Sequence, residues 1–270
     1  MNQSLIKVFT KDPSKGNPAF VVSLKHILTE EEAKQIAKTN KALTVFIYNN
    51  DGYKEIRFFT AKKELPFCGH GLIAASYYLM SNNDRELKLI VNKKEITIIK
   101  NENGFIQFGA GCLIIDNRQI NLQEILDFLN IPEFAIDVDY PLTIASIGSP
   151  KLLVPVKNLK YLQDISPDFQ KISKWSAYNQ VNGMYVYTKD TLSSTSDFHT
   201  RSFNPLFGID EDIATGVAAG ALCGVIHHKF NKKNLIIEQG HNFNHDCRIS
   251  TFIDIKGDIQ VGGFATYFKQ

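Results

Sequence analysis

The sequence has few of the features that mark membrane, exported or nucleic-acid-binding proteins. Its longest apolar stretch, Ala214 to Ile226, is interrupted by glycines and is shorter than the roughly 20 residues that a membrane helix needs. The first residues, Met1 to Lys7, contain no apolar run typical of a signal peptide. The net charge is only +2 and the lysines are scattered, which argues against nucleic acid as a partner. We therefore expect a soluble, cytoplasmic protein that binds neither membranes nor nucleic acids.

Cysteine is scarce, and its spacing excludes the usual disulfide and zinc patterns. The chain has four cysteines, which lie far apart. In a chain expected to stay in a reducing compartment, they are predicted to be free thiols. His241, His245 and Cys247 lie close in sequence, but their spacing matches no common zinc arrangement. The sequence therefore predicts no metal site. The cysteines are Cys68, Cys112, Cys223 and Cys247.

The most informative feature that is present is a helix start that occurs twice, about half a chain apart. A strand expected at residues 55–60, which carries Arg57, leads through a loop into Cys68-Gly69-His70-Gly71. A strand expected at 198–203, which carries Arg201, leads through a longer loop into Asp212-Ile213-Ala214-Thr215-Gly216-Val217. Both segments continue as small, apolar residues, which predicts a buried helix. A glycine-rich first turn presents free backbone N–H groups and the positive end of the helix dipole. Each turn is therefore a candidate site for a carboxylate.

The repeat extends over most of the 270 residues. It predicts an α+β fold of two pseudo-symmetric domains, each a curved, mostly antiparallel sheet around a central buried helix. The domains are expected at residues 1–117 and 118–270, with the last strand able to return to the first domain. Gly216, Gly220 and Gly224 recur every four residues and are expected to let another backbone approach the second helix closely. The other repeated segments are Gly16 to Val22 with Gly148 to Val154, and the amphipathic helices Glu30 to Lys38 and Asp168 to Trp175, while a helix at Leu122 to Leu129 joins the halves.

At this point the chain resembles the PhzF-like phenazine-biosynthesis family, whose fold is shared with diaminopimelate epimerases and proline racemases. The resemblance implies two similar domains with a ligand cleft between them, no metal or organic cofactor, and a homodimer. It also implies isomerase activity on a small amino-acid-like carboxylate. The matching stretches are Val8-Phe9-Thr10, Gly16-Asn17-Pro18-Ala19, Phe58-Phe59-Thr60 through Glu64 to Cys68-Gly69-His70, Gly208 to Asp212, Ala214-Thr215-Gly216 and Gln239-Gly240.

The family's isomerase uses four side chains, and the resemblance places two of them on residues that can carry a proton. The histidine falls on His70 and the aspartate on Asp212, which are the expected catalytic residues. The glutamate, which moves the proton in that family, falls on Leu43, and the serine falls on Val217. An alkyl side chain cannot transfer a proton. The expected substrate-binding residues are Asn17, Gly69, Gly71, Thr215, Gly216 and Val217.

Several of these residues have a second interpretation. His70 either faces the ligand as a neutral imidazole or only caps its helix, and Asp212 either faces the ligand or serves as an N-cap. Glu211 is the one nearby acid that could replace the missing glutamate. Cys68 could act as a base, as the first thiol of the related racemases does, but the second thiol would fall on Thr215, so a buried thiol is favoured.

Two functions therefore remain open. The first is a cofactor-independent isomerase or epimerase with His70 as acid and base and Asp212 as its partner. The second is a catalytically silent family member that binds a small carboxylate or a protein.

Overall fold

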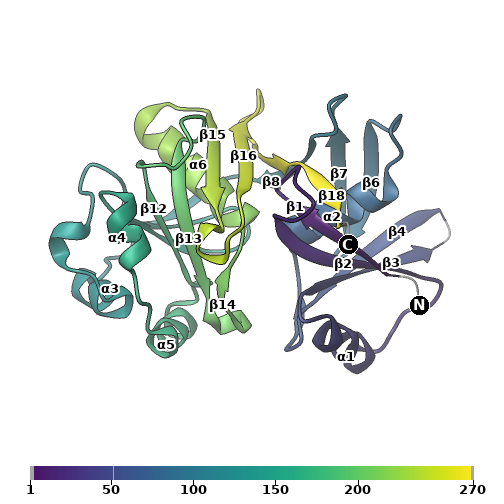
Figure 1. The fold of residues 1–270 in the computed structure, drawn as a ribbon, viewed down its shortest axis with the longest axis horizontal. Coiled ribbons are helices and arrows are strands. Elements are labelled where there is room, and N and C mark those ends of the chain that lie inside the picture. The colour runs from purple at the N-terminus through teal and green to yellow at the C-terminus, as the bar shows by residue number, and fades with distance from the viewer. Residues whose placement is uncertain (1–2, 51, 269–270) are drawn as a thin grey trace. The chain divides into compact units, whose positions relative to one another are not determined.

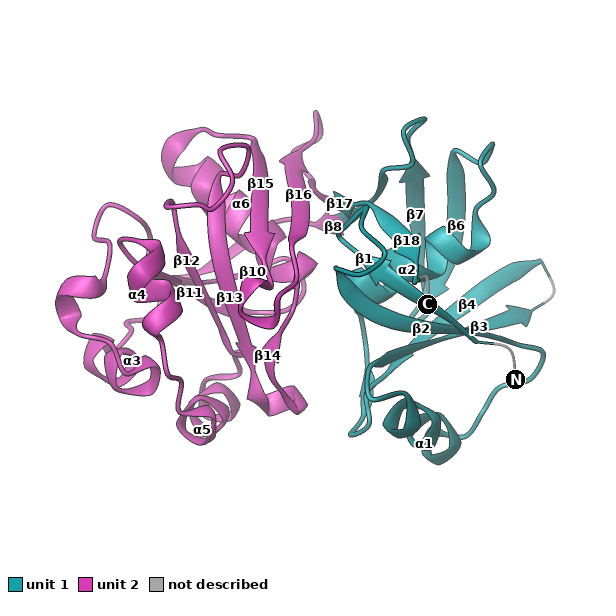
Figure 2. Ribbon diagram, in the orientation of Figure 1, with its two compact units in different colours: residues 1–109, 262–270 teal, residues 110–261 magenta. Residues whose placement is uncertain are grey.

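The computed structural model describes residues 3–50 and 52–268 (Figure 1), and its chain separates into two compact units (Figure 2). Unit 1 comprises residues 1–109 together with 262–270, and unit 2 comprises residues 110–261. The chain therefore passes from one unit to the other twice. The domain boundary expected between residues 117 and 118 stays a prediction.

Unit 1 is a mixed sheet built along the order β18-β1-β2-β3-β4-β6-β7-β8. Its β2–β3 and β4–β6 pairs are parallel, and its other pairs are antiparallel. A two-residue strand, β5, pairs with the end of β4. The bounds are β1 (Gln3–Val8), β2 (Asn17–Leu24), β3 (Leu43–Asn50), β4 (Tyr53–Phe59), β5 (Glu64–Leu65), β6 (Glu86–Val91), β7 (Lys94–Lys100), β8 (Ile106–Gly111) and β18 (Ala265–Tyr267).

Unit 2 repeats this arrangement along the order β9-β10-β11-β12-β13-β15-β16. Here β11–β12 and β13–β15 are the parallel pairs, and the short β14 pairs with the end of β13. The predicted pseudo-symmetric α+β fold is confirmed. The bounds are β9 (Ile114–Asp116), β10 (Thr143–Ser146), β11 (Lys151–Pro155), β12 (Met184–Thr188), β13 (Phe198–Asn204), β14 (Ile209–Asp212), β15 (Asn234–Gln239), β16 (Cys247–Ile253) and β17 (Ile259–Gly263).

Each unit has one central helix, with one outer helix in unit 1 and three in unit 2 packed on the apolar side of the sheet away from it (Figure 1). The central helices, α2 (Gly69–Leu79) and α6 (Gly216–Phe230), are buried along most of their length, as their uniformly apolar sequences predict. No helix in the described part of the chain is long and apolar enough to cross a membrane. The outer helices are α1 (Glu30–Asn40), α3 (Leu122–Leu129), α4 (Leu159–Asp164) and α5 (Phe169–Asn179), and the 3₁₀ turns are Glu133–Ala135, Pro205–Phe207 and His241–Phe243.

The strands of unit 2 divide their side chains between two faces because side chains alternate along a strand. Leu152, Val154, Met184 and Phe203 enter the apolar core that α3, α4 and α5 cover. The residues between them therefore point to the opposite face. The α6 helix packs on β10, β11, β15 and β16.

At Gly220 and Gly224 of α6, side chains and not another backbone lie closest to the helix. The expectation that another backbone approaches the helix there is therefore wrong. A Cβ built on Gly220 would lie 2.3 Å from Cδ1 of Ile147. One built on Gly224 would lie 2.8 Å from Cδ1 of Leu113 and 2.9 Å from Cδ1 of Ile259. Branched aliphatic side chains fill the space that the missing Cβ atoms leave, which packs α6 tightly within its unit.

Candidate functional site

Two helices differ from the other α-helices of the described residues in how they begin. The first turn of α1 is closed by a capping box, in which Thr29 accepts from the N–H of Glu32. In α3, α4 and α5, a side-chain oxygen of the N-cap residue accepts from a backbone N–H of the first turn; these residues are Asn121, Asn158 and Asp168. Neither α2 nor α6 has a side-chain cap. The two buried helices thus begin at turns whose positive dipole end no capping side chain closes.

The start of α2 carries His70 in a confined position. This residue is 8% exposed, and its Nδ1 atom lies 3.4 Å from Sγ of Cys68, the preceding N-cap residue. Cys68 is itself buried, as favoured from the sequence. All four cysteines are thiols rather than halves of disulfides, as their spacing predicts. The structure therefore places an imidazole in the first turn of a buried helix, with a thiol beside it.

Leu43 lies against the same turn. A Cβ built on Gly71 would be 2.8 Å from Cδ2 of Leu43 and 2.7 Å from Cδ1 of Phe58. Only a glycine at position 71 leaves room for these two side chains. The position to which the resemblance assigns the family's glutamate therefore points at the helix turn that carries His70, and here it is apolar.

The start of α6 is organised by Asp212, Thr215 and Gln239. The Thr215 hydroxyl donates to Oδ2 of Asp212 at 2.7 Å. The amide of Gln239 bridges the same loop, because its Nε2 donates to the Asp212 carbonyl at 2.8 Å and its Oε1 accepts from the Thr215 N–H at 3.2 Å. Thr215, not Asp212, occupies the N-cap position. The interpretation of Asp212 as an N-cap is therefore wrong, because the chain turns for three more residues before the helix begins.

An arginine–glutamate pair fixes the strand before each of these helix starts. In unit 1, Arg57 on β4 donates to both carboxylate oxygens of Glu64 on β5, at 2.7 and 2.6 Å. In unit 2, Arg201 on β13 donates to both oxygens of Glu211 on β14, at 2.8 Å each. Bidentate pairs of this kind combine strength with a defined geometry. The hypothesis that Glu211 replaces the missing glutamate is not supported, since both of its oxygens are committed to Arg201.

The remaining candidates from the sequence lie in defined places. Asn17 is the first residue of β2 in unit 1 and is 5% exposed. Gly216 and Val217 form the first turn of α6, where Gly216 is buried and Val217 is half-buried. Near His241, whose Nε2 lies 3.3 Å from Oδ1 of Asp246, the described residues show no group of three metal-binding side chains. The predicted absence of a metal stays a prediction.

The comparisons with known proteins agree with this architecture. A family model described as phenazine biosynthesis-like protein matches residues 6–270. The chain belongs to the PhzF family. It is 33% identical over 242 residues to an uncharacterized isomerase of Clostridium acetobutylicum, a match that covers 83% of this chain and 78% of the relative. An uncharacterized isomerase of Bacillus subtilis is 28% identical over 281 residues, with 97% and 94% covered.

Solved structures show the same fold. The PhzF-family protein of Bacillus anthracis matches with a TM-score of 0.87 at 26% identity, covering 100% of this chain and 98% of that one. A hydroxyproline epimerase of Agrobacterium vitis, solved with trans-4-hydroxy-L-proline, matches with a TM-score of 0.65 at 8% identity over 99% of this chain and 90% of that one. At this identity the second match shows a shared fold only.

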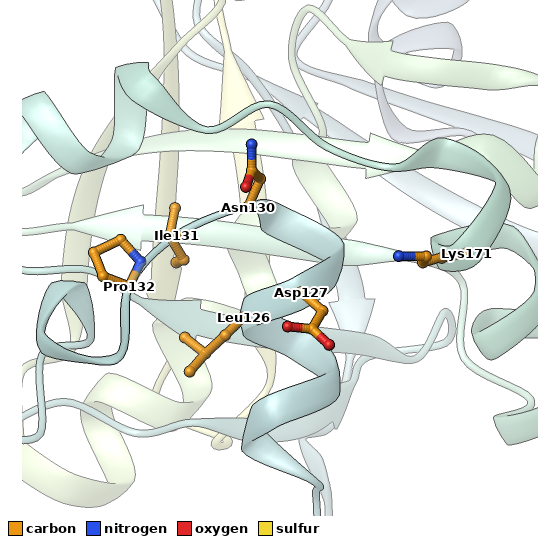
Figure 3. Close-up of a pocket in the computed structure, with 6 residues that line it drawn as sticks. All are labelled: Leu126, Asp127, Asn130, Ile131, Pro132 and Lys171. Atoms are coloured by element: carbon orange, nitrogen blue, oxygen red, sulfur yellow. The ribbon is translucent and has the colours of Figure 1, made fainter.

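Two surface pockets of this PhzF-family protein lie away from the predicted site residues. With volumes of about 450 and 440 Å³, they border α3 and α5 and share Lys171. Figure 3 shows the first, with Asp127 and Leu126 on α3 and Lys171 facing them from α5. Neither pocket includes a residue of the predicted site. They are open hollows between outer helices, so we do not assign the function to them.

Sequence reasoning missed three polar residues near the start of α6. In the sequence, Gln239 is only part of a short stretch that matches the family. Its contacts with Asp212 and Thr215 depend on strand register. The Tyr185 hydroxyl donates to Oε1 of Gln239 at 3.2 Å. Lys151 lies in an otherwise apolar strand, Lys151–Pro155, and this break in the pattern was the one signal available.

Proposed function

We propose that this PhzF-family protein is an isomerase or epimerase that moves a proton at a carbon next to the carboxylate of a small amino-acid-like substrate, with neither metal nor organic cofactor. One observation carries the proposal. The two buried helices begin without side-chain caps, and these two turns carry the imidazole of His70 and the hydroxyl–carboxylate pair of Thr215 and Asp212.

The chemistry follows from these groups. When a proton leaves the carbon next to a carboxylate, negative charge spreads onto the carboxylate oxygens. Backbone N–H groups and helix dipoles that already point at those oxygens stabilise this charge without rearranging. His70 serves as the acid and base, because an imidazole transfers protons effectively near neutral pH. Gly69 and Gly71 add no side chains of their own to the turn, and Gly71 leaves room there for Leu43 and Phe58.

In the proposal, Asp212 assists His70 or holds the amino group of the substrate. Its carboxylate is oriented by Thr215, and its backbone by Gln239, so it is held before a substrate arrives. Asn17, Gly216 and Val217 complete the proposed substrate contacts. We further propose that the protein is a homodimer and that it is located in the cytoplasm.

The test is hydrogen exchange at carbon. We expect the wild-type protein in D₂O to replace a carbon-bound hydrogen of at least one compound in a panel of cyclic and linear amino acids, monitored by proton NMR. His70→Asn is expected to lower the rate at least 100-fold, as loss of a general acid–base group does. His228→Asn, at the exposed end of α6, is the matched control and should exchange at the wild-type rate. Exchange by His70→Asn at the wild-type rate would contradict the assignment.

A second candidate function rests on Leu43 and Val217. Both place alkyl groups where the family has proton-carrying or hydroxyl side chains, which favours a silent protein that binds a small carboxylate. A thermal-shift screen combined with the exchange assay separates the two cases, because a silent binder is stabilised by RT ln(1 + [L]/Kd) but exchanges no carbon-bound hydrogen. Exchange in D₂O by the wild type excludes this alternative.

A further inference from the structure

One face of the unit 2 sheet carries a buried row of polar side chains. Tyr185 pairs with Ser202, and Ser202 pairs with Asp212, so these three side chains lie on one face. Leu153 pairs with Tyr185, and Lys151 lies two residues before Leu153, which puts Lys151 on the same face. This face is opposite to the apolar core under α3, α4 and α5. The row therefore leads across four neighbouring strands, β11, β12, β13 and β14, from Lys151 to Asp212.

Lys151 is enclosed by this polar row. It is 3% exposed, and its Nζ donates to the carbonyl of Asn182 and to Oδ1 of Asn204. Asn204 in turn donates to the Ser202 hydroxyl at 3.3 Å. Burial lowers the pKa of Lys151 to about 7, and the charge of Asp212 acts in the opposite direction. The amine is thus held by two neutral oxygens, and the negative charge that acts on it is that of Asp212.

The tyrosines on this face carry no charge at neutral pH, and Asp210, two residues before Asp212 on the same strand, is exposed to solvent. Burial raises the pKa of Tyr185 and that of Tyr187 well above the ordinary value of a tyrosine. Ser202 and Asn204 are neutral. Lys151 and Asp212 are therefore the two ionic groups of this polar row.

The internal repeat shows that the fold does not require a lysine here. The segment Gly148-Ser149-Pro150-Lys151 is the counterpart of Gly16-Asn17-Pro18-Ala19 in unit 1. Ala19 takes the equivalent place at the start of a central strand and is fully buried. Burying an amine costs free energy that an alanine or methionine would not. A function at the start of α6 explains why a lysine is present in unit 2.

We propose that Lys151 is a positioning residue that acts through Asp212, as the counter-charge that allows the start of α6 to receive the carboxylate of a substrate. The inference rests on the proposed function, because it takes the ligand to be a carboxylate. A second carboxylate brought close to Asp212 is repelled, and the partial charge of a helix end offsets only about half a unit of that charge. Protonated Lys151 balances Asp212, so the incoming carboxylate meets no net negative charge.

The pH dependence follows with a definite sign. Below the pKa of Lys151, about 7, the amine is charged and the pair with Asp212 has no net charge. Above it the amine is neutral, and the pair carries one negative charge. We therefore expect the affinity for a carboxylate and the rate of carbon–hydrogen exchange to fall about tenfold as the pH rises from 6 to 9, because Lys151 loses its positive charge.

The first experiment needs no ligand. Lysine labelled with ¹³C at Cε is titrated by NMR, and the Lys151 signal is assigned by its loss in Lys151→Met. The expected midpoint lies near pH 7 in the wild type and falls in Asp212→Asn, which removes the opposing charge. Asp210→Asn, an exposed acid on the same strand, is the matched control and should leave the midpoint unchanged. A midpoint that Asp212→Asn does not move overturns the inference.

The second experiment measures binding of trans-4-hydroxy-L-proline and its amide between pH 6 and 9. The wild type should lose affinity for the acid as the pH rises. Lys151→Arg should keep its affinity over the whole pH range because arginine stays charged, whereas Lys151→Met should bind the acid weakly at every pH. Lys100→Met removes a buried lysine that lies in unit 1, and this variant should keep the wild-type dependence of affinity on pH. Equal pH profiles for wild type and folded Lys151→Met overturn the inference. If neither compound binds while Asp212→Asn moves the Lys151 midpoint, the charge pair stands and the proposed function fails for this substrate class.

Discussion

Replacement of Arg201 by methionine is expected to lower the free energy of unfolding of unit 2 by about 3–5 kcal/mol, the cost of leaving one partner of a buried ion pair alone. The Arg201 and Glu211 side chains are only 9% and 12% exposed. Arg201 also donates through Nη1 to the carbonyls of Leu162 and Ile165, at 3.0 and 2.9 Å. Without the guanidinium, Glu211 keeps a poorly solvated charge, and these carbonyls lose a donor.

The measurement is urea unfolding monitored by fluorescence of Trp175. This is the single tryptophan of the chain, and it packs against the unit 2 core. The matched control is Arg57→Met, whose pair with Glu64 is 22% and 33% exposed and is expected to contribute about 1 kcal/mol or less. The double variant Arg201→Met with Glu211→Leu should recover much of the loss. Equal, small effects of Arg201→Met and Arg57→Met would contradict the account.

The double variant Leu43→Glu with Val217→Ser is expected to raise carbon–hydrogen exchange at least 100-fold, the typical contribution of a general base. Leu43 is 8% exposed and lies against the turn that carries His70, so a glutamate there would place its carboxylate beside that turn. Val217 lies in the first turn of α6, where a serine hydroxyl becomes a further donor to a carboxylate.

The decisive control is Leu43→Gln with Val217→Ser, which reproduces the shape of the repaired side chains without a group that accepts a proton. We expect the glutamate variant to gain activity and the glutamine variant to stay at the wild-type rate, measured by NMR in D₂O on the panel used for the wild type. Equal gains in both variants would show that shape and not proton transfer limits the natural protein.

Much of the fold could be predicted because long segments with a clear pattern fix their own structure. The helix expected at Leu122 to Leu129 has these bounds in the structure, since Asn121 caps it and Asn130 ends it in the left-handed conformation. The two apolar helices were predicted from their glycine-rich starts. The repeat then constrained the second half from the first.

The short strands escaped prediction for a physical reason. Two strands are too short to show alternation of apolar and polar residues, namely Glu64–Leu65 and Ile209–Asp212. Each is fixed by a glutamate that pairs with an arginine on the neighbouring strand. Such pairs depend on register between strands, which the order of residues alone does not give.

The sequence could place the proposed site residues on elements of the fold, but it could not give their contacts. His70 and Asp212 were found through the repeated helix start and the family resemblance. The contact of Gln239 with Thr215 joins residues 24 apart in sequence, and that of Lys151 with Asn204 joins residues 53 apart. Only the folded sheet brings them together. The alternative interpretation of Asp212 as an N-cap failed because Thr215, three residues later, occupies that position.

The central claim is that the imidazole of His70 moves the proton, and chemical rescue tests it most directly. His70→Ala should lose exchange at carbon, and added imidazole should restore it in proportion to its concentration, because the free base can enter the space that the side chain leaves. Methylated imidazoles too large for that space should rescue poorly. Exchange by His70→Ala at the wild-type rate, with no response to imidazole, would contradict the claim.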